Sequence, residues 1–140
     1  MKKAESDKND NLKNDNNTIV FLVLRISKDS IQGKNVIEFV HKTKSLGKIK
    51  DNNNSHFNYE NYLTIDVYQQ DSIIHTMVIE HPLYKHVEYS GDNNILVSKY
   101  IELNKEEFFI RLQMTGDSNK IRISETLNNT SKKELAIIKL

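Results

Sequence analysis

Apolar and polar residues alternate with a period of two over most of the chain after residue 17, which is the pattern of strands whose sheet has two different faces. The clearest example is a hairpin, in which strands at 62–68 and 73–80 are joined by a polar connection at 69–72. In the first of these strands the odd-numbered residues are aliphatic, whereas the even-numbered residues are polar or tyrosine. The alternation therefore predicts a hairpin that packs one face against a core.

Five further segments carry strand patterns and are separated by turn residues. They lie at 19–26, 83–89, 95–103, 108–114 and 121–125. The first of them is a continuous β-branched and aromatic run, which predicts a strand buried on both faces. Two more segments fit two structures each. Residues 36–40 fit a strand or a short helix, and residues 131–140 fit a closing strand, which we favour, or a capped short helix.

This order of elements predicts an all-β fold. About seven or eight short strands follow one another, and the chain lacks the helices that connect parallel strands in α/β folds. The pattern favours an antiparallel two-sheet β-sandwich of the immunoglobulin-like or transthyretin-like type. A small closed β-barrel is the alternative, because barrels use strands of the same length and alternation.

The first 17 residues differ in composition from the rest of the chain. They contain one large aliphatic residue, Leu12, and no aromatic residue, so they cannot bury enough apolar surface to offset the entropy of ordering. We therefore expect residues 1–17 to be a disordered tail or tether and residues 18–140 to be one domain. Residues 42–61 are expected to be irregular, and loops of that length are commonly functional.

Charge and cysteine content exclude several classes of function. The 140 residues carry a net charge of +1, which gives no electrostatic basis for binding nucleic acid. There is no cysteine, so disulfides, thiolate metal sites and cysteine nucleophiles are excluded. No run of about eighteen apolar residues occurs, so no membrane span is expected. The start of the chain lacks the features of a signal peptide: a native Met1 indicates the cytoplasm, whereas a Met1 that replaces a removed leader indicates an exported or surface-tethered protein.

The most distinctive stretch is residues 80–89, where aromatic, basic and acidic side chains surround the single proline, Pro82. With strand alternation, Tyr84, His86 and Glu88 fall on one face. Tyrosine and histidine offer amphipathic contact area of the kind found in protein interfaces. These three residues are the first candidates for a surface that binds a protein partner. A bent strand pair with a polar outer face explains the same pattern without any binding function.

A carbohydrate-binding module is the second hypothesis. Sugar rings stack on aromatic side chains, and Tyr62 and Tyr68 fall on the polar face of one predicted strand, with Tyr59 in the loop before it. Tryptophan, which usually leads at such sites, is absent. Half-buried tyrosines are also common in ordinary sheets, so these three residues form a candidate platform and no more.

Metal binding and catalysis receive the weakest support. His75, His81 and His86 are weak candidates for a metal site, but their spacing is irregular and Pro82 disturbs the strand register. The aspartates in the predicted turns stand singly and do not repeat at alternate positions, as calcium loops require. No nucleophile motif or phosphate-binding glycine loop is present. The sequence therefore predicts a non-catalytic binding or assembly module without a cofactor, which acts through a sheet edge or a loop surface.

Overall fold

The computed structural model describes residues 17–29, 31, 34–50, 58–116 and 118–140. The tail predicted at residues 1–17 lies outside this part of the chain, except for Asn17. Within these ranges the regular structure is β-strand apart from one 3₁₀ turn, η1 (Asp92–Asn94). No helix in the same ranges has the length and apolar character needed to cross a membrane.

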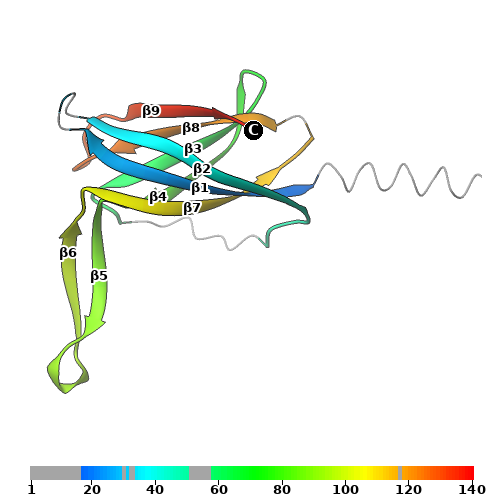
Figure 1. Cartoon of the computed structure of the whole chain (residues 1–140). Helices are drawn as coiled ribbons and strands as arrows, with labels where there is room; N and C mark the ends of the chain where they lie inside the picture. The colour runs from blue at the N-terminus through cyan, green and yellow to red at the C-terminus, as the bar shows by residue number, and fades with distance from the viewer. Residues whose placement is uncertain (1–16, 30, 32–33, 51–57, 117) are drawn as a thin grey trace, which may run out of the picture.

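The part of the chain that the structure describes forms nine strands, which pair antiparallel in three sheets (Figure 1). Sheet A has the order β2-β1-β7, with β1 (Thr18–Asp29), β2 (Lys34–Leu46) and β7 (Lys105–Met114). Sheet B has the order β4-β3-β8-β9, with β3 (Tyr62–Gln69), β4 (Ser72–Glu80), β8 (Ser118–Thr126) and β9 (Lys133–Lys139). The third sheet is a hairpin of β5 (Tyr84–Ser90) and β6 (Leu96–Glu102).

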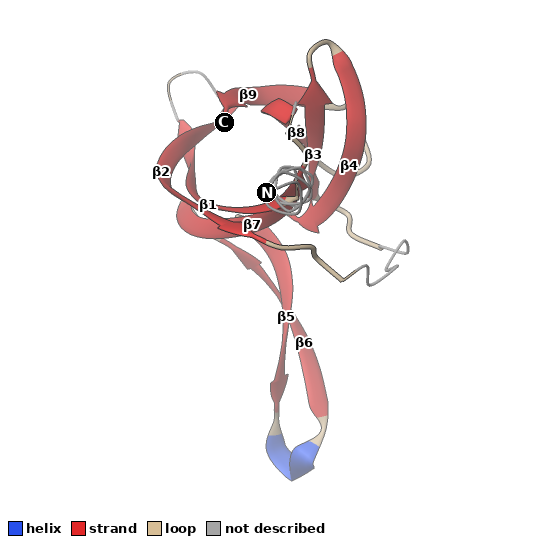
Figure 2. Ribbon diagram, turned by 90° about the vertical axis from the view of Figure 1, so that its right-hand side faces the viewer, coloured by secondary structure: helices blue, strands red, loops and turns tan. Residues whose placement is uncertain are grey.

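Sheets A and B lie on opposite sides of one hydrophobic core (Figure 2). The core consists of Leu83 and alternate side chains of four strands: Val20, Leu22, Leu24 and Ile26 from β1, Leu63, Ile65 and Val67 from β3, Ile110, Leu112 and Met114 from β7, and Ile121 and Ile123 from β8. The other face of β1 is only partly buried, so the expectation of burial on both faces is wrong. The apolar run is continuous because apolar side chains also occupy the outside of sheet A.

The predicted hairpin at 62–80 is confirmed as β3 and β4, in which Leu63 pairs with Ile79 and Ile65 with Met77. The ambiguous segments at 36–40 and 131–140 are both strands, β2 and β9. β2 continues through Leu46, so residues 42–46 are not irregular as expected. Those residues are mostly polar because β2 is an edge strand whose side chains are largely exposed, which hides its apolar alternation.

The alternative of a closed barrel is wrong. Sheet A ends at β2 and β7, and sheet B ends at β4 and β9, without hydrogen-bonded pairing between the sheets in the described residues. A barrel requires every strand to have two neighbours, and four described strands of sheets A and B have one. The described residues form nine strands where seven or eight were predicted, because both ambiguous segments are strands.

That hairpin, residues 84–102, stands away from the body and is called the arm (Figures 1 and 2). Pro82 lies two residues after the end of β4 and cannot donate a ladder hydrogen bond, so the chain leaves sheet B at this point. Leu83 is fully buried and fixes the exit of the arm in the core. The backbone closes the base through a hydrogen bond from the amide of Leu103 to the carbonyl of Leu83, at 2.8 Å.

Candidate functional site

The arm has two faces, which follow from its strand register. One face carries the pairs Lys85–Ile101, Val87–Lys99 and Tyr89–Val97, and the other carries Tyr84–Glu102, His86–Tyr100, Glu88–Ser98 and Ser90–Leu96. β5 and β6 pair only with each other among the described strands. A two-stranded ribbon without a covering layer leaves both of its faces open to water.

Large apolar side chains are exposed along the arm. The exposed fractions are 71% for Leu96, 61% for Ile95, 49% for Tyr89 and 43% for Tyr100. These side chains belong to both faces of the ribbon, and all except Tyr100 lie near the turn. Exposed apolar residues that are gathered in this way mark interaction sites more often than single exposed residues do.

Charged contacts hold the proximal half of the arm to the body. Lys28 of β1 lies 3.5 Å from Glu102 and 5.0 Å from the ring centre of Tyr84. Lys85 lies 3.8 Å from Glu106 at the start of β7. These partly exposed pairs contribute little energy individually, but together they set the direction in which the arm leaves the body.

The three primary candidates from the sequence share one face of β5, as the alternation predicts. Tyr84 lies at the base, half-buried, with its ring 4.7 Å from the ring of His81. His86 is exposed in the middle of the arm, and its ring lies 5.3 Å from that of Tyr100 on β6. Glu88 is exposed toward the tip. That these residues bind a partner stays a prediction.

Sequence reasoning missed the β6 half of this surface. Ile95 and Leu96 are the most exposed apolar residues of the arm, and neither was singled out. The sequence signal was the apolar pair Ile95 and Leu96 directly after the polar turn at 90–94. The pair is exposed because its hairpin pairs with no other described strand. Alternation alone does not reveal whether a strand has neighbours.

The tyrosines proposed as a sugar platform are not brought together. Tyr62 and Tyr68 occupy opposite ends of β3, roughly 20 Å apart at the usual rise of a strand. Cationic groups lie over the ring of Tyr68, with Lys120 at 5.0 Å and Arg122 at 5.4 Å from its centre. Tyr59 lies before β3 and is itself exposed. The fold therefore does not place the rings of all three tyrosines on one flat surface.

The three histidines are also separated. His75 is exposed on β4, His86 is exposed on the arm, and His81 is fully buried between them in sequence. No group of three or more His, Cys, Asp or Glu residues in the described part of the chain is arranged to hold a metal ion.

His81 belongs instead to a buried polar network at one end of the core. Its Nε2 donates a hydrogen bond to Oε1 of Glu125 at 2.7 Å, and Nδ2 of Asn35 donates to the same oxygen at 2.5 Å. The amide of Leu83 donates to Nδ1 of His81 at 3.1 Å, which fixes the tautomer with the proton on Nε2. His81, Glu125 and Asn35 are 0%, 4% and 6% exposed. The network joins β2 of sheet A, β8 of sheet B and the base of the arm.

The network holds Glu125 in its ionised form. Burial by itself raises the pKa of this carboxyl, but the hydrogen bonds from His81 and Asn35 and the charge of Lys133 outweigh burial and lower the pKa below its ordinary value. The sequence carried a signal for this residue, because Glu125 continues the inward-facing series of Ile121 and Ile123. A carboxylate on a core face requires partners, and the strand pattern could not name them.

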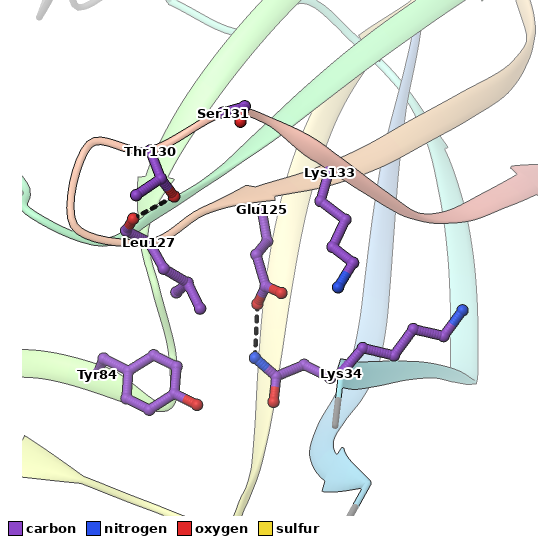
Figure 3. A pocket seen from close by; sticks show the side chains of 8 residues that line it. Lys34, Tyr84, Glu125, Leu127, Thr130, Ser131 and Lys133 are labelled. Carbon is purple, nitrogen blue, oxygen red and sulfur yellow. Dashed lines mark hydrogen bonds between the residues drawn. The ribbon is translucent and has the colours of Figure 1, made fainter. Parts of the chain in front are cut away.

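A pocket of about 220 Å³ opens beside this network (Figure 3). Its lining includes two lysines, two hydroxyl residues and the carboxylate: Lys34, Lys133, Thr130, Ser131 and Glu125 line it together with Asn35, Tyr84 and Leu127. Tyr84 links the pocket to the base of the arm. Oε1 of Glu125 accepts both hydrogen bonds, from His81 and from Asn35. These bonds connect the two sheets and the base of the arm, which gives the carboxylate a structural role.

Comparison with known proteins adds no family to this description: no family model matches the sequence, no curated protein matches it, and no solved structure matches the fold at a significant level.

Proposed function

We propose that the protein is a non-catalytic binding module that presents its β5–β6 arm to a protein partner. The observation that carries the proposal is the exposure of Tyr89, Ile95, Leu96 and Tyr100 on a ribbon that no other described strand covers. Isolated two-stranded hairpins are at best marginally stable in water, so covering the arm would both hide its apolar side chains and order its backbone. The body, in contrast, is a closed core with a fixed attachment point for the arm.

The body serves this function as a rigid platform. We propose that sheets A and B form a sandwich of the immunoglobulin-like or transthyretin-like type, because two antiparallel sheets face each other across one aliphatic core. The charged contacts of Lys28 and Lys85 and the buried His81–Glu125 pair set the base of the arm against this platform. A partner would therefore meet an arm with a defined direction.

The distribution of polar residues along the arm favours a protein over a lipid surface. The extreme tip is the polar turn with Asp92, Asn93 and Asn94, and the apolar residues lie behind it. Insertion into a bilayer would lead with these polar groups and desolvate the carboxylate of Asp92. A protein that packs against the side of the ribbon contacts the apolar belt and leaves the turn in water.

Site-specific photo-crosslinking in extracts of the source cell tests this proposal. A photo-reactive amino acid in place of Leu96 is expected to give a discrete product of higher mass with a protein. The matched control replaces Ile137, which is 53% exposed on β9 and distant from the arm in sequence and sheet. Equal crosslinking at both positions, or none at Leu96, would contradict the proposal.

A further inference from the structure

A second uncovered apolar surface lies on the outside of sheet A. The register aligns Phe109 with Val23 and His41 across three strands, and in the next outward row it aligns Arg111 with Phe21. These five residues are called the outer patch. Phe109 is 74% exposed, which is the largest exposed fraction of any aromatic side chain in the described residues. Phe21 and Val23 are partly exposed beside it.

The arm and the outer patch face the same space. In Figures 1 and 2 the arm leaves one end of the body and points away from sheet B, on the side to which the outer face of sheet A is turned. Phe109 is only a few residues along β7 from the base of the arm. The arm therefore projects from the body at an angle, and each of the two carries one exposed apolar surface.

We infer that the partner of the arm is a second copy of this chain, and that the arm of each copy packs on the outer patch of the other. This inference rests on the proposed function and names its partner. A two-fold axis makes the arrangement closed, because each copy gives an arm and receives one, so neither the arm nor the outer patch is left free to propagate the assembly.

Charges on the two surfaces complement each other. Glu88 is exposed on the distal arm and Arg111 is exposed on the outer patch, and no ion pair of either residue occurs within the described chain. The other charged residues near the base of the arm, Lys85 and Glu102, are already paired with the body. An arm that packs on the outer patch places an unpaired carboxylate near an unpaired guanidinium, which favours this pairing of surfaces over arm against arm.

Reciprocal exchange also enlarges the contact. Every copy contributes one face of an arm and one outer patch, so two equivalent contacts form where a single arm would form one. A standard interface involves roughly 20 to 30 residues on each side, and one arm face alone would fall far short of this size.

Analytical ultracentrifugation of the full chain over a range of concentrations tests the inference. The wild-type protein is expected to form a reversible dimer. Leu96→Asp damages the arm and Phe109→Asp damages the outer patch, and each is expected to weaken the dimer by roughly tenfold or more, because buried apolar anchors dominate such contacts. Ile137→Asp introduces the same charge on β9 and is expected to leave the dimer unchanged. All three positions are exposed, so in dilute solution, where the wild type is monomeric, the melting temperature of each variant should remain that of the wild type.

Mixing distinguishes reciprocal exchange from other dimers. Leu96→Asp retains an intact patch and Phe109→Asp retains an intact arm, so an equimolar mixture is expected to form heterodimers more strongly than either variant associates with itself.

Reversing the two charges tests the predicted contact between Glu88 and Arg111. Glu88→Arg and Arg111→Glu are each expected to weaken association, and the double variant is expected to restore it. A wild-type protein that is monomeric at every concentration overturns the inference, as does a dimer that tolerates Phe109→Asp.

Crosslinking separates failure of this inference from failure of the proposed function. A monomeric protein whose Leu96 position crosslinks to a different protein disproves self-association and leaves the arm as the binding element. A monomeric protein without any crosslink at Leu96 disproves both.

Discussion

Removing the carboxylate of Glu125 tests the claim that a buried polar network holds the two sheets and the arm base together. The substitution Glu125→Ala removes the acceptor of two buried donors, Nε2 of His81 and Nδ2 of Asn35. Both donors lie in residues that are at most 6% exposed, so solvent compensates poorly for the lost acceptor. Each donor left without a partner costs about 1–3 kcal/mol.

For the two donors together these costs predict a loss of about 2–6 kcal/mol in the free energy of unfolding for Glu125→Ala. Glu125→Gln keeps an oxygen that accepts both hydrogen bonds and loses only their charge assistance. It is expected to cost about 1–2 kcal/mol, because bonds to a charged acceptor exceed neutral ones by about that amount.

Urea unfolding followed by far-UV circular dichroism measures both values, with Glu134→Ala as the control. Glu134 is exposed on β9, so its replacement should change stability by less than about 0.5 kcal/mol. If Glu125→Ala were as mild as Glu134→Ala, the network would not stabilise the fold and the reasoning would be refuted.

The same residue predicts a dependence on pH. The folded-state pKa of Glu125 lies below its ordinary value of 4.5, so the unfolded chain binds the proton first as the pH falls. The stability from ionised Glu125 is therefore fully present above that value and is lost as the pH falls through the folded-state pKa. The difference in stability between wild type and Glu125→Gln should shrink over this acidic range, and a difference that grows there would contradict the assignment.

Three further substitutions test the fold by the same urea titration. Leu22→Ala in β1, which is fully buried, should cost about 2–5 kcal/mol, and a loss below 1 would show that the core between the sheets is loose. Gly47→Ala should cost about 1–3 kcal/mol, because Gly47 has a φ of +148° that other residues rarely adopt; an unchanged stability would contradict this backbone conformation. Asp66→Ala removes the acceptor of Thr76 at 2.8 Å and of Arg122 at 3.0 Å, and should destabilise by about 1–3 kcal/mol, whereas a neutral result would mean that Asp66 is not buried.

The strands were predictable where one face is buried and the other is exposed, because apolar and polar residues then alternate along the sequence. The hairpin at 62–80 follows from alternation alone, because β3 is central and its neighbours bury one face of aliphatic residues. The extent of β2 was not predictable, since an edge strand carries lysine, threonine and serine at positions that a central strand would fill with apolar residues. Closure into a barrel depends on pairing between distant edges, which period-two patterns do not encode.

The candidate site was predictable only in part. Alternation placed Tyr84, His86 and Glu88 on one face, and the structure has them so. It did not reveal that their hairpin lies outside both larger sheets, because the sequence of a strand reports its pattern and not the number of its neighbours. The partners of Glu125 were equally hidden, since Asn35 lies 90 positions away and His81 lies 44 positions away along the chain.

Hydrogen exchange at two protein concentrations tests the binding role of the arm most directly. In dilute solution the amides of residues 86–100 are expected to exchange faster than those of β1, β3 and β8, because the distal arm has no covering layer. In concentrated solution the arm and the outer patch should both become protected, while the exposed edge strand β4 stays unchanged. Arm amides that exchange as slowly as those of β1 in dilute solution would contradict an uncovered arm, and arm amides that exchange at the same rate at both concentrations would contradict exchange of arms between copies.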